Sequence, residues 1–205
     1  MNQLGEGGRV GFAASFFHDL ADEEIDRFLV PFFDFGNRFR VLGEHLVDHL
    51  FQVITDRATR PARAGRVRID FHQSRNVERA PVVKVQTETG SMRVSTPEAT
   101  AFDLVRFAAA AGHASNVATV LSELSEKLGP AALEKLADSY VVPEVQRIGY
   151  LLEQLGEYDL AKPLAEWLGK RRYRPIPLVP GKALGKISAD PKWRVLPNER
   201  VEVDL

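Results

Sequence analysis

Two histidines, His45 and His49, lie four residues apart in the stretch "GEHLVDHL". On a helix this spacing places both imidazoles on one face, where they can bind a metal ion. The glutamate of the HExxH zinc motif is missing, and the spacing supplies no third ligand. His18, His72 and His113 stand alone in the sequence, and an isolated histidine is usually a structural or surface group. We therefore expect no metal site, no catalytic residue and no cofactor.

Two further patterns bear on enzymatic chemistry. The glycine-rich stretch "GEGGRVG" lacks the lysine and hydroxyl residue that end a phosphate-binding loop, and no strand precedes it. A metal-dependent nuclease needs clustered carboxylates to hold its cation, and no lysine-bearing carboxylate motif accompanies Asp56 and Asp70. A nuclease is thus the least favoured alternative, and we expect a protein that is not an enzyme.

Positive charge gives a stronger signal, because it is segregated along the chain. Residues 1–50 carry 4 Lys/Arg and 9 Asp/Glu, whereas residues 51–84 carry 8 Lys/Arg and 3 Asp/Glu, although the whole chain has a net charge of −1. A basic region of this kind binds nucleic-acid phosphates or an acidic partner. The alternative is a solvated face that the acidic N-terminal segment balances.

The elements that position this charge are predicted strands. The run "FQVIT" is rich in β-forming residues, and "RVRIDF" alternates strictly, with Val67, Ile69 and Phe71 on one face. Residues 81–87 form a third run, with Val83 and Val85 on one side, and a turn through Gly90 leads into a fourth. These runs predict one small, mainly antiparallel sheet with its apolar face inward.

The cations then project from the opposite face of the sheet or lie in the loop before "RVRIDF". A second basic cluster surrounds Tyr173, whose ring can stack on a base or anchor the end of a helix. The candidate residues for binding nucleic acid or a protein partner are Arg57, Arg60 and Arg63 in the loop, Arg66, Arg68, Lys84 and Arg93 on the sheet, and Arg171, Arg172 and Arg174 in the second cluster.

The stretch "MRVSTPEATAFDLVRF" changes the apolar period from that of a strand to that of a helix. Ser95 or Thr96 can cap the helix, Pro97 suits its first turn, and Glu98 stands where a capping box with Ser95 requires it. We expect this helix to bury Phe102, Val105 and Ala109 and to end at Gly112.

Four more helical patterns follow, with short connections that imply antiparallel packing. Their apolar stripes are Val117, Val120, Leu121, Leu124 and Leu128; Leu133, Leu136, Ala137 and Tyr140; Val145, Ile148, Leu152 and Leu155; and Leu160, Leu164, Trp167 and Leu168. In the third, Gly149 allows close approach of another helix. Residues 170–205 are basic and proline-rich and predict an extended arm outside the core, ending in a short strand. The predicted fold class is α+β: a small, mainly antiparallel sheet followed by a bundle of about five helices.

Composition sets limits on the class of protein. The 205 residues include no cysteine, so the chain folds without disulfides. No run of 18 apolar residues and no secretory signal pattern occur, which predicts a cytoplasmic protein without membrane contact. Nine of the 12 phenylalanines lie within the first 51 residues. We therefore predict an atypical, aromatic and acidic N-terminal segment, 1–50, before a domain at 51–205 with its sheet at 51–95, helices at 96–169 and a basic arm and tail at 170–205.

Several segments, in order, resemble the C-terminal domain of AbiEi-type antitoxins. They are "FQVITDRATRP", "GRVRIDF", "MRVSTPEATAFDLVRF", "NVATVLSEL", "VQRIGYLLEQLG", "LAKPLAEWL" and "DPKWRVLPNERVEVDL". The resemblance runs from about residue 50 to the C-terminus. It implies an antitoxin of a type IV toxin–antitoxin system, linked to abortive infection and phage defence, that opposes a nucleotidyltransferase-like toxin and represses the shared promoter.

In that family a winged-helix DNA-binding domain usually precedes the C-terminal domain, whose positive residues support antitoxicity. The resemblance makes Arg57, Arg60, Arg66, Arg68 and Arg93 the expected functional positions. Residues 1–50 depart from the pattern, because they are acidic and contain no evident helix-turn-helix pair. Two alternatives follow: a regulator that binds operator DNA, or a truncated interaction module that does not.

Overall fold

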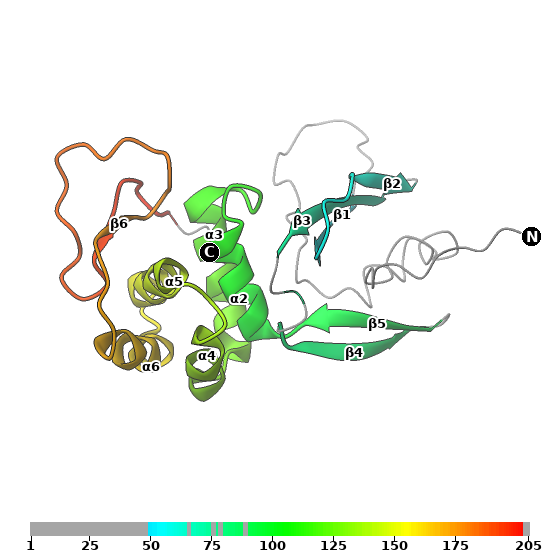
Figure 1. Ribbon diagram of the computed structural model, residues 1–205, viewed down its shortest axis with the longest axis horizontal. Helices are drawn as coiled ribbons and strands as arrows, with labels where there is room; N and C mark the ends of the chain where they lie inside the picture. Colours follow the sequence, from blue (N-terminus) through cyan, green and yellow to red (C-terminus); the bar gives the residue numbers. More distant parts are fainter. Residues whose placement is uncertain (1–48, 65–66, 75–76, 78–79, 88–89, 203–205) are drawn as a thin grey trace, which may run out of the picture. The chain divides into compact units, whose positions relative to one another are not determined.

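The computed structural model describes residues 49–64, 67–74, 77, 80–87 and 90–202. The chain divides into two compact units, Met1–Val94 and Ser95–Leu205. The described part of the first unit consists of strands, and the second consists of helices followed by a non-helical C-terminal segment (Figure 1). The α+β class and the order of sheet and helices are as the sequence predicts. The division at residue 50 stays a prediction, since residues 1–48 are outside the described part.

The first unit contains a three-stranded sheet of β1 (His49–Thr55), β2 (Ala62–Ala64) and β3 (Val67–Gln73), in the order β1-β3-β2. Strand β3 pairs parallel with β1 and antiparallel with β2. Ile69 is buried between exposed Arg68 and half-buried Asp70, as the alternation of "RVRIDF" predicts. The short strand β2 was not expected, because "ARA" has no apolar alternation.

The other two strands of this unit, β4 (Val82–Thr87) and β5 (Gly90–Ser95), form a separate two-stranded sheet. Only two residues separate them, a connection far too short for parallel strands. The described strands of this unit thus form two small sheets, where the sequence predicted a single small one. Val82 and Val83 are both exposed, so β4 has no clearly buried face.

Helix α2 (Pro97–Arg106) begins as predicted. Thr96 is its N-cap, and the Thr96 hydroxyl accepts the N–H of Ala99 at 3.3 Å. The expected capping box is absent, because Glu98 Oε1 accepts the N–H of Gly129 at 3.0 Å instead. The first turn of α2 is thereby tied to the start of α4 (Pro130–Ala137).

The end of α2 differs from the prediction. The helix stops at Arg106, and turns occupy residues 107–112, so that Ala109 is exposed. Gly112, with a φ of +80°, stands at the N-cap of α3 (His113–Leu124) and does not end α2. Its left-handed conformation, which glycine adopts without strain, turns the chain into the next helix.

The remaining predicted helices are confirmed. Helix α3 continues into a 3₁₀ turn, η2 (Ser125–Lys127), and α4 is followed by α5 (Val142–Gln154) and α6 (Tyr158–Gly169). Helices α4 and α5 both pack on α6, and α2 packs on α5 (Figure 1). Leu133, Ile148, Leu152 and Leu164 are completely buried in the core between them. No helix in the described ranges combines the length and apolar character needed to span a bilayer.

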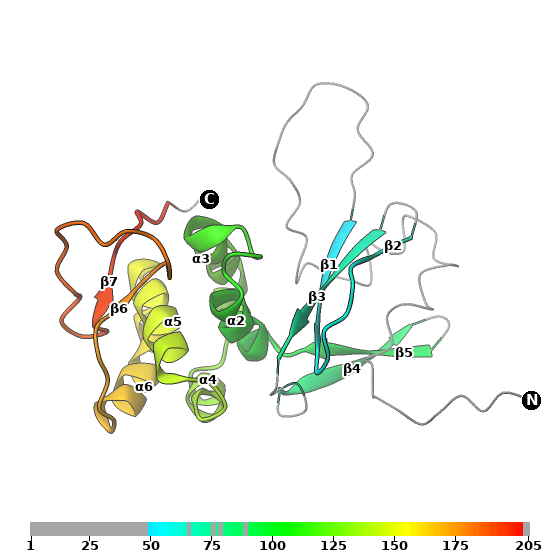
Figure 2. The same cartoon turned by 45° about the horizontal axis from the view of Figure 1, so that its top comes forward.

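The C-terminal segment, residues 170–202, contributes residues to the core and so is not an arm outside it. Its strands β6 (Ile176–Pro177) and β7 (Val195–Leu196) pair in parallel, and β7 contacts α5 (Figure 2). Trp193 is 1% exposed and Val195 is completely buried. The indole of Trp193 lies where Gly149 lacks a side chain, so Gly149 admits this ring and not a neighbouring helix.

Candidate functional site

The predicted basic residues of the first unit fall on both of its sheets. Arg68 lies on β3, whereas Lys84 and Arg93 lie on the two-stranded sheet, all three exposed. Arg57 and Arg60 are exposed in the connection between β1 and β2, as expected. Arg63 is on β2 and not in a loop. Arg66 lies outside the described residues.

Several of these cations are already engaged. Arg68 donates from Nε and Nη2 to the two carboxylate oxygens of Asp70, at 3.1 and 3.0 Å. Arg57 Nε lies 3.9 Å from the Asp56 carboxylate. Arg63 stands directly opposite Arg68 across the strands and is engaged in an interaction of its own. Two like charges in this position repel each other, which Asp70 offsets.

Among the described residues of this unit, the other three cations have no such neighbour. Arg60, Lys84 and Arg93 are exposed, and no hydrogen-bond or ion-pair partner for their side chains is found in the described part of the chain. Their charge is therefore available to an external anion. We call Arg60, Lys84 and Arg93 the open cations of the strand unit.

The second predicted cluster separates into two kinds of arginine. Arg171 is structural: it donates to Asp138 Oδ1 at 2.9 Å and to the Trp167 carbonyl at 2.8 Å, and its guanidinium lies 3.5 Å from the centre of the Trp167 ring. Arg172 and Arg174 are exposed, without a side-chain partner among the described residues. From the sequence alone, all three arginines were expected to bind nucleic acid or a protein partner.

Tyr173 anchors the C-terminal segment. Its hydroxyl donates to the carbonyl of Lys192 at 2.9 Å, and the guanidinium of Arg194 lies 5.1 Å from its ring centre. The ring is half-buried. Tyr173 thus holds two parts of the C-terminal segment together, a role that was not among those expected from the sequence.

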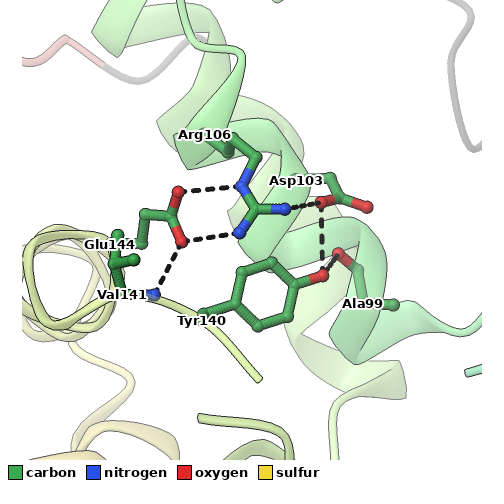
Figure 3. A network of polar contacts seen from close by, with 6 residues as sticks. All are labelled: Ala99, Asp103, Arg106, Tyr140, Val141 and Glu144. Carbon is green, nitrogen blue, oxygen red and sulfur yellow. Dashed lines mark hydrogen bonds and ion pairs between the residues drawn. The ribbon is translucent and has the colours of Figure 1, made fainter. Parts of the chain in front are cut away.

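A network of buried polar side chains joins α2 to α5 (Figure 3). Arg106 donates from Nε and Nη2 to the two oxygens of Glu144, at 2.8 and 3.0 Å. Glu144 also accepts the N–H of Val141 at 3.1 Å, at the start of α5. The Tyr140 hydroxyl donates to Asp103 Oδ1 at 3.2 Å, while the Arg106 guanidinium lies 4.5 Å from the Tyr140 ring centre.

Burial controls the electrostatics of this network. It raises the pKa of Asp103 to about 6, although the charge of Arg106 and the hydrogen bond from Tyr140 act in the opposite direction. Burial and the charge of Asp103 also raise the pKa of Tyr140. For Arg106, burial acts to lower the pKa, but the hydrogen bond and charge of Glu144 outweigh it and raise the pKa. The Arg106–Glu144 pair therefore joins α2 to α5. The Asp103 carboxyl is buried beside it, and the charge of Arg106 offsets the effect of that burial on its pKa only in part.

Sequence reasoning did not find this network. A signal was present: Asp103 and Arg106 interrupt the apolar stripe of α2, and Glu144 follows Pro143 in the first turn of α5. Polar residues at core positions of a helix require partners. The sequence alone could not say that the partners come from two different helices.

The other chemical candidates do not assemble into a site. In the described ranges, no group of three or more His, Asp or Glu residues is placed to hold a metal ion. Asp70 is bound to Arg68, His72 is half-buried in β3, and His113 begins α3. His18 and His45 lie outside the described residues.

The family model of the AbiEi antitoxin C-terminal domain matches residues 44–154, more than half of the chain. The chain therefore belongs to the AbiEi antitoxin family. The match includes the strands of the first unit and ends with α5, so the expected resemblance is matched only as far as residue 154. Helix α6 and the C-terminal segment follow it.

A search of curated proteins finds no match. Among solved structures, the RV2827C protein from Mycobacterium tuberculosis is 18% identical with a TM-score of 0.39, over 51% of this chain and 35% of that protein. The chain thus spans about a third of the length of that protein.

Proposed function

We propose that this chain is the antitoxin of a type IV toxin–antitoxin system and opposes a nucleotidyltransferase-like toxin in the cytoplasm, without catalysing a reaction itself. The observation that carries the proposal is the family match over residues 44–154. It covers the strand unit's described residues, which include the open cations, and four helices of the second unit.

The strand unit supplies the means of attachment. Arg60, Lys84 and Arg93 carry positive charge that no described side chain neutralises. Exposed cations of this kind attract acidic protein surfaces and nucleic-acid phosphates, and they accelerate the encounter with them. We therefore assign antitoxicity to the open cations of the strand unit, and to Arg57, Arg63 and Arg68 a supporting contribution to the positive field.

Co-expression with the nucleotidyltransferase-type toxin tests the proposal. The wild-type chain should restore growth, and the triple variant Arg60→Ala, Lys84→Ala, Arg93→Ala should restore it poorly. The matched control is Lys127→Ala, Lys135→Ala, Lys162→Ala, which removes the same charge from exposed positions of the helical unit. Continued toxicity beside soluble wild-type protein would contradict the proposed function.

Repression of the shared promoter is the second proposed activity. Residues 51–84 carry 8 Lys/Arg against 3 Asp/Glu, which favours binding of operator DNA. A gel-shift series at increasing salt decides the question. A specific complex that weakens steeply with salt supports a regulator, whereas no complex beside full growth rescue supports an interaction module that does not bind DNA.

A further inference from the structure

The C-terminal segment, residues 170–202, carries 9 Lys/Arg and 3 Asp/Glu. Several of these charges are neutralised within the helical unit. Lys192 lies 3.1 Å from the Glu153 carboxylate, and Lys182 lies 2.7 Å from the Glu199 carboxylate. Arg171 is held by Asp138. Arg172 and Arg174, in contrast, have no side-chain partner among the described residues.

The backbone that carries Arg172 and Arg174 is fixed. Gln146, buried on α5, donates to the Arg174 carbonyl at 3.0 Å and to the Trp193 carbonyl at 2.8 Å. Arg147 on the same helix donates to the Pro177 carbonyl at 3.0 Å. The two arginines are therefore presented from an ordered support, which lowers the entropy lost when they bind a ligand.

The exposure of residues 172–174 alternates. Arg172 and Arg174 are exposed, and Tyr173 between them is half-buried against Lys192 and Arg194. The two exposed arginines therefore flank the half-buried Tyr173 in the sequence. Each guanidinium has a planar set of donors that matches a phosphate group.

Three apolar residues of the segment are turned inward, whereas Leu184 is 45% exposed. Leu178 is 4% exposed, Trp193 is 1% exposed and Val195 is completely buried. A stable protein–protein interface usually has an apolar centre, whereas contacts to a nucleic-acid backbone are mainly charged and polar. The Arg194 guanidinium already lies over the half-buried Tyr173 ring, which leaves less of that ring to stack on an unpaired base. Both observations favour the backbone of a duplex.

We propose that Arg172 and Arg174 form a phosphate-binding site for the backbone of double-stranded nucleic acid, separate from the open cations of the strand unit. Arg171 is not part of this site, because its charge is used within the helical unit. The site does not depend on the antitoxin activity and would remain if growth rescue failed.

Fluorescence anisotropy with a labelled 20-base-pair DNA duplex of arbitrary sequence tests the site. The full chain should bind with a linear dependence of log K on log salt concentration. Each lost phosphate contact reduces the magnitude of that slope by about 0.9. The variant Arg172→Ala, Arg174→Ala should therefore reduce it by about 1.8 and bind the duplex about tenfold more weakly at low salt. The control Lys127→Ala, Lys135→Ala removes the same charge at exposed positions and should keep the wild-type slope.

Thermal unfolding of both variants should match wild type, because neither arginine has a partner in the described structure. An unchanged slope and affinity in the arginine variant would overturn the site. An equal loss in the lysine control would overturn it as well, since net charge alone would then explain binding. A variant that keeps duplex binding but loses binding of polyglutamate would show an acidic protein as the partner, and would also overturn it.

Discussion

Arg106 and Glu144 form a two-point ion pair between α2 and α5, with donor–acceptor distances of 2.8 and 3.0 Å. Their side chains are 17% and 11% exposed, so water screens the pair only weakly. The same carboxylate accepts the N–H of Val141 and so satisfies a donor at the first turn of α5. The pair thus connects the helix that begins the second unit with a central helix of its core.

Removal of one partner of this pair should destabilise the protein. We expect Arg106→Ala to lower the free energy of unfolding by about 3 kcal/mol, because it leaves the Glu144 carboxylate buried without its cation. Urea unfolding followed by circular dichroism measures the change. The double variant Arg106→Met, Glu144→Met should lose less than Arg106→Ala, since no buried charge remains. If Arg106→Ala lowers the free energy of unfolding by less than about 1 kcal/mol, as is typical of an exposed ion pair, the result would contradict a buried Arg106–Glu144 pair.

Asp103 should make stability depend on pH. Its pKa is raised from 3.8 to about 6 in the folded protein, so the folded state holds the proton over a range in which the unfolded state has lost it. The free energy of unfolding therefore falls as pH rises from about 4 to above 6, by about 3 kcal/mol in total. The variant Asp103→Asn carries an amide that cannot ionise, so it should not show this fall.

The comparison of wild type and Asp103→Asn at pH 4.5 and pH 8 isolates the effect. The variant should gain stability relative to wild type at the higher pH, because wild type then contains a buried carboxylate beside Arg106, Tyr140 and Glu144. Its amide oxygen can still accept the Tyr140 hydrogen bond. Parallel pH profiles for the two proteins would show that Asp103 does not titrate in this range.

The helices of the second unit could be predicted from the sequence because each has apolar residues at helical spacing and a glycine or proline at its boundary. Strand β3 was predictable for the same reason, from the alternation around Ile69. The division into separate sheets was not, since pairing between strands depends on contacts that a single run of residues does not encode. The buried C-terminal segment was missed because its proline and lysine content suggested exposure, whereas Trp193 and Val195 decide its packing.

The candidate site was predictable in its residue types but not in their roles. Positive charge in residues 57–93 and 171–174 is visible in the sequence. Which arginines keep that charge depends on carboxylates that reach them in space, such as Asp138 beside Arg171, 33 residues away in the chain. The pair of Arg68 and Asp70 is an exception that the sequence can predict. Residues two apart in a strand lie on the same side of it, so these two side chains are neighbours by their spacing alone.

Arg171 and Arg172 should therefore respond differently to substitution. Arg171→Ala removes the contact with the Trp167 ring and the ion pair with exposed Asp138, which together should lower the free energy of unfolding by about 1 kcal/mol. Arg172→Ala should leave it unchanged within about 0.5 kcal/mol. Chemical denaturation of the two single variants measures both values. Equal effects would show that the structural distinction between the two arginines is wrong.

Gly149 sets the position of the C-terminal segment on α5. A methyl group at this position would overlap the indole ring of Trp193, which is almost completely buried and whose Nε1 donates to Glu153. Gly149→Ala should therefore lower the free energy of unfolding by about 2 kcal/mol and loosen residues 170–202, despite the better helix propensity of alanine. Limited proteolysis should cut this segment faster than in wild type, and tryptophan emission should shift to longer wavelength as Trp193 meets water. The control is Gly169→Ala at the end of α6, where an added methyl group meets no atom within 4 Å and should cost no stability. If both variants have wild-type stability and proteolysis, the indole of Trp193 does not occupy the space beside Gly149 in solution.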